Sequence, residues 1–451
     1  VEDDILLQRR GGIDLLVGQE PGAVGAEGQI VVFGEDIAQE RAPECRRSAR
    51  TEDMGNQEVF TRPSAMLDDE RLGALNQAVD EIANTWRPDD PAYRADVYRQ
   101  IMMQFSYGYF AFFHADAEHP DFAPLWNPVY TLQPNPDDIY LYCPISIEHS
   151  YRLSGNRGTV KMLLINTQGG LPGVGVTDYT GVSYADIDDG DLTLDAQGNF
   201  ELLISAEKPA GYTGDWLPIK PGASCLMTRY RSYDWVNEID PQMSIECLTA
   251  KNLKKRLSVD DILERIKLMA RMPVEAQKSF YAMQNQVKAN VGTNVFEPTR
   301  LGGALTKQIY IPAVFEFEPG EALILETDLP AKRRYWNWQL NDPYFNAVEY
   351  VYRLSSTNGH FAHVASDGRF YAVLSLEDPG VPNWLDTAGY TEGTIYGRWF
   401  ECDSHPMPTL KRVKFSEIRD HLPKDTPVVT PEERAEQLRQ RVRGCQRRRR
   451  W

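Results

Sequence analysis

The spacing of hydrophobic positions predicts helices in the first part of the folded chain. Residues 67–86 read LDDERLGALNQAVDEIANTW, and their apolar positions recur every three or four residues, as in an amphipathic helix. Residues 93–113 predict a second helix, which is richer in aromatic residues and therefore expected to be more buried. The intervening RPDDP ends the first helix, because proline interrupts the helical hydrogen-bond pattern. Residues 61–120 are thus predicted to form a helical segment.

Strand-like alternation replaces this spacing after residue 121. In the stretch DDIYLYCPISIEHSYRLSGNRGTVKMLLINTQ, alternating residues are followed by a turn at residues 155–158 and then by a β-branched and aliphatic run, which predicts a hairpin. A second strand pair is predicted around Gly198 in LTLDAQGNFELLISA, and a further strand in SCLMTRYRSYDW. Residues 121–250 are therefore predicted to form a first β-rich domain of antiparallel strands.

A helical insertion is predicted over residues 251–295. It is predicted to begin at Ser258, which forms a capping pair with Asp261, and to end near Gly292. We expect Pro273 to break this insertion into two helices.

Strands are predicted again over residues 296–425, the second β-rich domain. The stretches that carry them are KQIYIPAVFEFEPGEALILETDLP, RYWNWQL, AVEYVYRL and HFAHVASDGRFYAVLSLED, the last with a hairpin signal at residues 366–368. Thr430, Pro431 and Glu433 then form a capping box with proline at the first helical position, which predicts a basic C-terminal helix over residues 426–451. The expected fold class is α+β, with two β-sandwich (jelly-roll-like) segments, a helical insertion and flanking helices.

The first 60 residues do not share these patterns. They are rich in glycine and charge and are expected to form a mobile extension. Because the chain starts at Val1 and its first methionine is Met54, the leading segment is hypothesised to lie outside the functional product.

Composition narrows the range of partners. The 451 residues carry a net charge of -17, which disfavours a broad nucleic-acid surface. The basic tail at Arg447–Arg450 is the local exception, and we expect either contact with an anionic partner or a solvated helix end. The six cysteines lack zinc spacing, and no apolar stretch reaches membrane-spanning length, so free thiols and a cytoplasmic location are expected.

No metal or cofactor is predicted. The run DIDDGD at residues 186–191 departs from the calcium-loop pattern, and a solvated acidic turn is favoured over a cation site. His360 and His363 would face opposite sides of a strand, which disfavours joint ligation of one metal. The sequence has no phosphate-binding loop and no nucleophile elbow, although residues dispersed in sequence can still converge in space.

Aromatic and amide residues on the predicted C-terminal strands are the best candidates for a site. Alternation along RYWNWQL places Arg334, Trp336 and Trp338 on one face and Tyr335, Asn337 and Gln339 on the other. Such a mixture suits a buried polar network or a pocket for a small ligand, and both alternatives stay open. The candidate acid or base is Asp386, and the candidate ligand-binding residues are Arg334, Trp336, Gln339, Asn383, Trp384, Arg398 and Trp399.

The run DPGVPNWLDTAGY at residues 378–390 is explained almost entirely as a corner. Proline and glycine turn the chain, Asn383 and Asp386 can bond nearby backbone amides, and Trp384 can fill the open end of a sandwich. Only Trp384 and Asp386 are left as possible contacts for a ligand at the sandwich mouth.

Several motifs resemble a known bacterial family. NPDDIYLYCPI, YRLSGNRGTV, RYWNWQL and above all DGRFYAVLSLEDPGVPNWLDTAGY are similar to the domain of unknown function 1214 family. The resemblance implies jelly-roll-like sandwiches with helices beside them and, in some members, an oligomer. It implies no reaction and no catalytic residues.

Three functions remain as hypotheses. The first is binding, with or without chemical processing, of a small organic ligand at the mouth of a sandwich. The second is a non-catalytic carbohydrate-type binding module, with Trp336, Trp384 and Trp399 as stacking platforms. The third is a homo-oligomeric structural protein whose basic tail contacts a neighbour. Sandwich folds host all three, so the fold does not rank them.

Overall fold

The computed structural model describes residues 6–10, 13–17, 70–83, 93–172, 175–176, 182–298, 305 and 307–448. The chain divides into two units, Val1–Thr61 and Arg62–Trp451. In the first unit, β1 (Leu6–Arg10) and β2 (Ile13–Val17) pair as antiparallel strands. The sequence predicted no strands there, so this expectation was wrong for the two described segments. Cys45 and Met54 lie outside the described residues.

Two β-sandwiches make up most of the second unit. In the first sandwich, one sheet has the order β11-β10-β5-β13 and the other β3-β4-β12-β6-β9. The buried cluster between these sheets includes Leu153, Leu202 and Leu226. The strands are β3 (Ala123–Pro124), β4 (Asp138–Pro144), β5 (Tyr151–Asn156), β6 (Met162–Gln168), β9 (Ser183–Asp188), β10 (Asn199–Ser205), β11 (Asp215–Pro218), β12 (Cys225–Arg231) and β13 (Gln242–Cys247), and a small separate pair is formed by β7 (Leu171–Pro172) and β8 (Gly175–Val176).

The second sandwich has sheet orders β14-β20-β16-β17 and β19-β18-β15-β21. Trp338 lies in the cluster between them, and a Cβ on its cross-strand partner Gly397 would come within 2.2 Å of the indole. Only glycine leaves the indole room at that position. The strands are β14 (Gln308–Glu316), β15 (Glu321–Thr327), β16 (Arg333–Asn341), β17 (Ser356–Asn358), β18 (Phe370–Ser375), β19 (Trp384–Asp386), β20 (Glu392–Cys402) and β21 (Thr409–Lys414).

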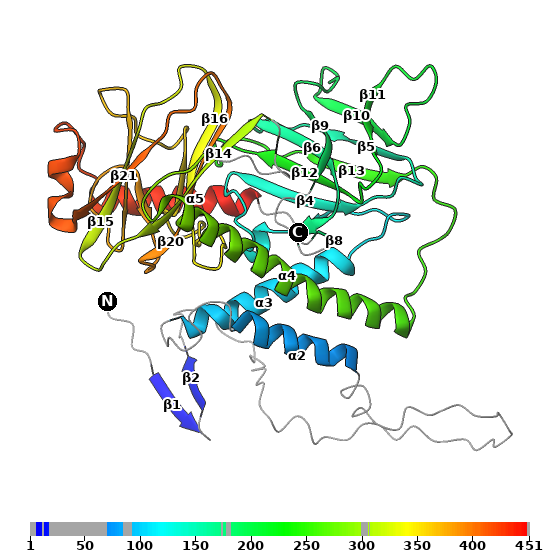
Figure 1. Cartoon of the computed structure of the whole chain (residues 1–451), viewed down its shortest axis with the longest axis horizontal. Helices are drawn as coiled ribbons and strands as arrows, with labels where there is room; N and C mark the ends of the chain where they lie inside the picture. The colour runs from blue at the N-terminus through cyan, green and yellow to red at the C-terminus, as the bar shows by residue number, and fades with distance from the viewer. Residues whose placement is uncertain are drawn as a thin grey trace, which may run out of the picture. The chain divides into compact units, whose positions relative to one another are not determined.

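Helices pack beside both sandwiches (Figure 1). The predicted pair is present as α2 (Glu70–Ala83) and α3 (Arg94–Phe112). The insertion forms α4 (Val259–Val291), with Ser258 and Asp261 in a capping box and Gly292 at its C-cap, as predicted. The expected break at Pro273 is absent, because the helix continues through this position. Its packing against α2 and α3 supports the helix there, and Gly108 of α3 allows close approach to Met269.

The remaining described elements are two short 3₁₀ helices, η2 (Asn127–Val129) and η3 (Phe415–His421), and the helix α5 (Pro431–Arg448). The predicted capping box of α5 is present: the Thr430 amide donates to Glu433 Oε2 at 2.8 Å, and the Glu433 amide donates to Thr430 Oγ1 at 3.2 Å. The observed α+β architecture with two β-rich sandwiches and flanking helices confirms the expected fold class.

Four local strand predictions differ from the structure. The turn at residues 155–158 does not close a hairpin, since β5 pairs with β10 and β13 whereas β6 pairs with β12 and β9 in the opposite sheet. Residues 192–194 and 347–354 form no strand. In the latter segment the Glu349 carboxylate accepts the amides of Val351 and Tyr352 at 2.7 and 2.8 Å, which holds a loop. The hairpin signal at residues 366–368 yields a turn closed by one bridge, Val364 to Phe370.

Candidate functional site

Each sandwich turns the outer face of one sheet towards the other sandwich. On β12, Leu226 belongs to the first sandwich's own core, whereas Met227 points to the opposite face. On β20, Ile395 belongs to the second core and Tyr396 to the opposite face. Met227 and Tyr396 share one buried cluster with residues of α3 and α4. We call the space enclosed by these faces of β4, β6 and β12, of β14, β16 and β20, and by the two helices the shared interior.

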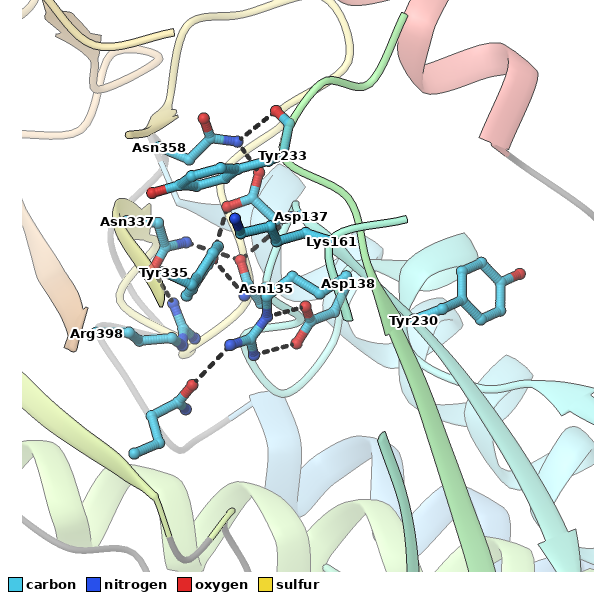
Figure 2. Close-up of polar contacts among 12 residues, drawn as sticks. Asn135, Asp137, Asp138, Lys161, Tyr230, Tyr233, Tyr335, Asn337, Asn358 and Arg398 are labelled. Carbon is cyan, nitrogen blue, oxygen red and sulfur yellow. Dashed lines mark hydrogen bonds and ion pairs between the residues drawn. The ribbon is translucent and has the colours of Figure 1, made fainter. Parts of the chain in front are cut away.

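A buried hydrogen-bond network fills one end of the shared interior (Figure 2). The Tyr335 hydroxyl donates to Asp137 Oδ2 at 2.6 Å, and Asn358 Nδ2 donates to Asp137 Oδ1 at 2.6 Å. Asn135 Nδ2 donates to the Tyr335 hydroxyl at 2.8 Å, and Asn337 Nδ2 donates to Asn135 Oδ1 at 2.7 Å. Residues of both sandwiches therefore satisfy one another here, which is the requirement for stable burial of polar groups.

An ion pair continues this network. Arg231 donates through Nε and Nη2 to the two oxygens of Asp138, at 2.5 and 2.7 Å, and through Nη1 to Gln308 Oε1 at 2.9 Å. Burial by itself would raise the pKa of the Asp138 carboxyl, but the guanidiniums of Arg231, Arg398 and Arg229 hold it below its usual value. Asp138 therefore stays ionised in the interior.

The neighbouring carboxyl behaves differently. Burial raises the pKa of Asp137, hydrogen bonds from Tyr335 and Asn358 oppose the rise, and the charge of Asp138 adds to it. The two adjacent carboxyl groups thus differ in how readily they hold a proton.

Two arginine–tyrosine pairs lie next to the network, one on each sandwich. Arg229 on β12 is directly opposite Tyr140 on β4, and its guanidinium lies 5.6 Å from the centre of that ring. Arg398 on β20 is directly opposite Tyr310 on β14, at 5.5 Å from that ring. Burial raises the pKa of Tyr140, and Arg229, Arg398 and Tyr310 all act on it electrostatically. The four side chains therefore share one part of the shared interior.

Not every polar group in this region is satisfied within the described part of the chain. Arg229 is 6% exposed, and its Nε has no hydrogen-bond partner there. Asn166, 2% exposed, lies opposite Met227 on β6, and its Oδ1 also lacks a partner. Since alternate residues of β6 and β12 point to the same side, both groups face the shared interior. A buried donor and a buried acceptor without partners are costly unless another molecule completes them.

Two of the predicted ligand-binding residues belong to this region. Arg398 donates through Nη1 to Gln339 Oε1 at 2.7 Å and to Asn337 Oδ1 at 3.3 Å. Gln339 in turn donates to Asn341 Oδ1 at 2.7 Å. The alternation predicted along RYWNWQL is therefore present, with Asn337 and Gln339 on the side that faces the first sandwich.

The tryptophans of the same strands point the other way. Trp336 and Trp399 are 2% and 1% exposed, lie in the core of the second sandwich, and have ring centres 6.1 Å apart. They are core residues in this structure, with no open face for a ligand.

Arg334 lies in a separate cluster that joins the sandwiches. It contacts Asp189 at 2.8 Å and Glu401 at 3.0 Å, while Lys307 contacts Asp188 at 2.7 Å. The run DIDDGD was expected to be a solvated acidic turn, but Asp188 and Asp189 have side chains only 6% and 8% exposed and are paired with cations. Among the described residues no group of three or more potential metal ligands occurs.

The corner at residues 378–390 is held by its own side chains. Asn383, at φ 54°, donates to the carbonyls of His363 and Tyr371, both at 2.7 Å, and accepts the His363 amide at 2.9 Å. Asp386 is 5% exposed and accepts from Arg353 Nη1 and from the Ala388 amide, both at 2.8 Å. The Asp386 side chain thus faces inwards, whereas Asn383 is partly exposed and its amide group is occupied by backbone partners. His360 and His363 were expected to face opposite sides of a strand, but neither residue lies on a strand, so this expectation was wrong.

Trp384 is the partly exposed member of the corner. Its indole donates to the Ser375 carbonyl at 3.3 Å, and the Arg434 guanidinium lies 5.5 Å from its ring. It borders a groove of about 150 Å³ beside α5. Arg434 donates to Asp378 and to the Val381 carbonyl, so its guanidinium is already bonded within the protein.

Arg448, at the basic end of α5, is not solvated as one of the two alternatives expected, while contact of the tail Arg447–Arg450 with an anionic partner stays a prediction. Arg448 is 3% exposed and donates to the carbonyls of Asp137 at 2.8 Å and Tyr230 at 3.4 Å. Arg441 lies 4.5 Å from the Trp235 ring and donates to the Tyr350 carbonyl at 2.5 Å. Arg447 is exposed, and residues 449–451 lie outside the described part. Arg448 therefore anchors the helix internally.

Sequence reasoning missed Arg229, Tyr140 and Tyr310. The signal available was the TRYR of β12, in which two arginines occupy alternate positions of an otherwise apolar strand and so point to one face.

The fold and the shared interior define an α+β protein of two sandwiches that face each other across a polar and aromatic layer. No family model matches the chain, and no curated protein matches it either. Among solved structures, it is similar to an uncharacterised protein from Burkholderia cenocepacia, with 25% identity, a TM-score of 0.71, and coverage of 77% of this chain and 96% of that chain. A protein from Vibrio parahaemolyticus matches at 12% identity and a TM-score of 0.41, over 74% of this chain and 100% of that chain.

Proposed function

We propose that the protein binds a small organic ligand in the shared interior, between the two sandwiches. The observation that carries this proposal is Arg229, which is 6% exposed, has no ion pair among the described residues, and has a buried Nε without a hydrogen-bond partner there. An uncompensated buried charge costs several kcal/mol, so a chain that retains one gains from a ligand that pairs with it. The site expected from the sequence, the mouth of one sandwich, is replaced in this proposal by the interior.

The carbohydrate-module alternative has less support. It needs tryptophans with open ring faces, whereas Trp336 and Trp399 are buried in the second core. The described residues include no helix that is both long and apolar enough to cross a membrane. Membership of the domain of unknown function 1214 family, a homo-oligomeric state and a cytoplasmic location stay predictions from the sequence.

Arg229→Met tests the proposal, because methionine keeps an unbranched apolar stem and removes the charge. We expect the ligand-free variant to be at least as stable as wild type, since a buried unpaired charge is removed. We also expect it to lose small molecules that wild-type protein retains from a bacterial extract, as identified by mass spectrometry after denaturation.

Arg231→Met is the matched control on the same strand and face. It removes the partner of Asp138 and should destabilise the protein strongly. If Arg229→Met destabilises to the same degree, or retains the same small molecules as wild type, Arg229 is a structural residue and the proposal fails.

A further inference from the structure

The shared interior contains more buried positive charge than its carboxylates balance. The guanidiniums of Arg229, Arg231 and Arg398 are 6%, 1% and 3% exposed. Arg231 has Asp138 as its counter-ion. Arg398 donates to the amide oxygens of Asn337 and Gln339, and Arg229 has no ion pair within the described residues. Two guanidiniums are therefore left without a carboxylate of their own.

The other buried carboxyl does not supply the missing charge. Asp137 accepts from neutral donors, the Tyr335 hydroxyl, Asn358 and the Trp235 indole, the last at 2.8 Å. Its charge acts on Arg441 and Arg448 of α5, and Arg448 also pairs with Asp240 at 3.4 Å. The excess at Arg229 and Arg398 consequently remains.

The geometry of the two arginines suits a planar acceptor. Each guanidinium lies over the ring of its cross-strand tyrosine, Tyr140 or Tyr310, at 5.6 and 5.5 Å. Contact with a ring face leaves the N–H edge of a guanidinium available for a carboxylate, which it matches with parallel hydrogen bonds. The tyrosine rings also fix the orientation of both side chains, which reduces the entropy lost when a ligand binds.

Apolar and aromatic side chains also line the shared interior beside these arginines. Tyr142 and Met227 of the first sandwich and Tyr396 of the second are 7%, 0% and 1% exposed and belong to one cluster with Tyr140 and Tyr310. An inorganic anion would leave this lining unused, whereas an organic acid places its apolar part there.

We propose that the ligand is an organic carboxylate whose oxygens are bound by Arg229 and Arg398 together and whose apolar part contacts Tyr142, Met227 and Tyr396. This inference rests on the proposed function and specifies the chemical class of its ligand. Asn166 Oδ1, on the same side of the sheet, is the acceptor for a hydrogen-bond donor on that ligand.

Calorimetric titration with matched acids and amides tests the class. Benzoate and hexanoate are compared with benzamide and hexanamide, which have similar shape and no charge, and with inorganic phosphate. We expect at least one acid to bind wild-type protein and its amide to bind at least about tenfold more weakly, because a hydrogen bond between two charged groups is stronger than one to a neutral group. Arg229→Met and Arg398→Met should each weaken that acid by about tenfold or more, and Arg229→Lys by less.

Arg443→Ala, at an exposed position of α5, is the control and should bind like wild type. The carboxylate assignment is overturned if acids and amides bind alike, if none of the acids binds, or if phosphate binds as well as the best acid. In the extract experiment, some molecules are expected to be retained by wild type and lost by Arg229→Met. If those molecules are neutral, the carboxylate assignment is overturned but the proposed function stands. If both proteins retain the same molecules, the proposed function itself is overturned.

Discussion

Arg231 and Asp138 are directly opposite each other on β12 and β4 and form a two-point ion pair with side chains 1% and 0% exposed. The same guanidinium reaches Gln308 on β14, so one side chain joins the two sandwiches. A buried pair of this kind contributes little compared with an apolar pair, but loss of one partner leaves a charge stranded.

Asp138→Asn is therefore expected to be among the most destabilising single substitutions in the chain. Removal of one member of a buried ion pair costs about 3–5 kcal/mol. Urea denaturation should show this loss, and the double variant Asp138→Leu with Arg231→Met should recover much of it. A loss below about 1 kcal/mol in the single variant would show that the pair is not buried as described.

Asp386→Asn separates a corner-holding role from a ligand-contacting role. The carboxylate pairs with Arg353 and caps the Ala388 amide, so we expect a loss of on the order of 1 kcal/mol in unfolding free energy. Retention of small molecules from an extract should be unchanged. If the variant is as stable as wild type but no longer retains the small molecules, Asp386 contacts the ligand and does not hold the corner.

Asp342 is expected to give the protein a pH-dependent contribution to stability. Burial raises its pKa to about 6, although the charge of Arg99 opposes the rise. The folded state therefore holds a proton that an unfolded aspartate, with a pKa of about 3.9, has lost. The contribution is present below about pH 4 and is lost as the pH rises through about 6, by on the order of 2–3 kcal/mol.

Asp342→Asn should remove this slope. The difference in unfolding free energy between variant and wild type, measured by urea denaturation from pH 4 to pH 7.5, should move in favour of the variant as the pH rises. A constant difference across this range would mean that the carboxyl titrates normally.

The internal anchor of α5 is tested with two arginines of the same helix. Arg448→Ala removes donors to the carbonyls of Asp137 and Tyr230 and the ion pair with Asp240, and should cost at least about 1–3 kcal/mol, because buried acceptors lose a partner. Arg443 is exposed, so Arg443→Ala should stay within about 0.5 kcal/mol of wild type. If thermal denaturation shows the same loss of stability for both variants, the charge of the helix, and not the buried contact of Arg448, stabilises the protein.

Local signals in the sequence were sufficient for the helix ends. Ser258 with Asp261, and Thr430 with Glu433, cap their helices because each pair lies within one turn. The turn at residues 155–158 was located correctly as a turn but assigned to a hairpin. A turn signal does not say which sheet the next strand joins, and here that depends on β10, β12 and β13, which follow much later in the chain.

The candidate site required contacts that sequence patterns do not contain. Gln339 and Arg398 were selected as polar residues on strands, and they do lie together in the shared interior. Arg229 was missed, because its importance depends on the lack of a bonded partner for its Nε, which only the packing of the two sandwiches decides. Asn383 and Asp386 were selected for the same polarity, yet Asn383 is bonded to the backbone of His363 and Tyr371, and Asp386 to Arg353 and the Ala388 amide.

The position of α5 in the chain has a consequence for the order of assembly. Both sandwiches precede this helix, and domains fold during synthesis at roughly 5–20 residues per second. Arg441 and Arg448 reach carbonyls next to the joint between the sandwiches only after both have been made. The nascent protein therefore passes through a stage in which both sandwiches have been synthesised and the buried contacts of Arg441 and Arg448 have not yet formed.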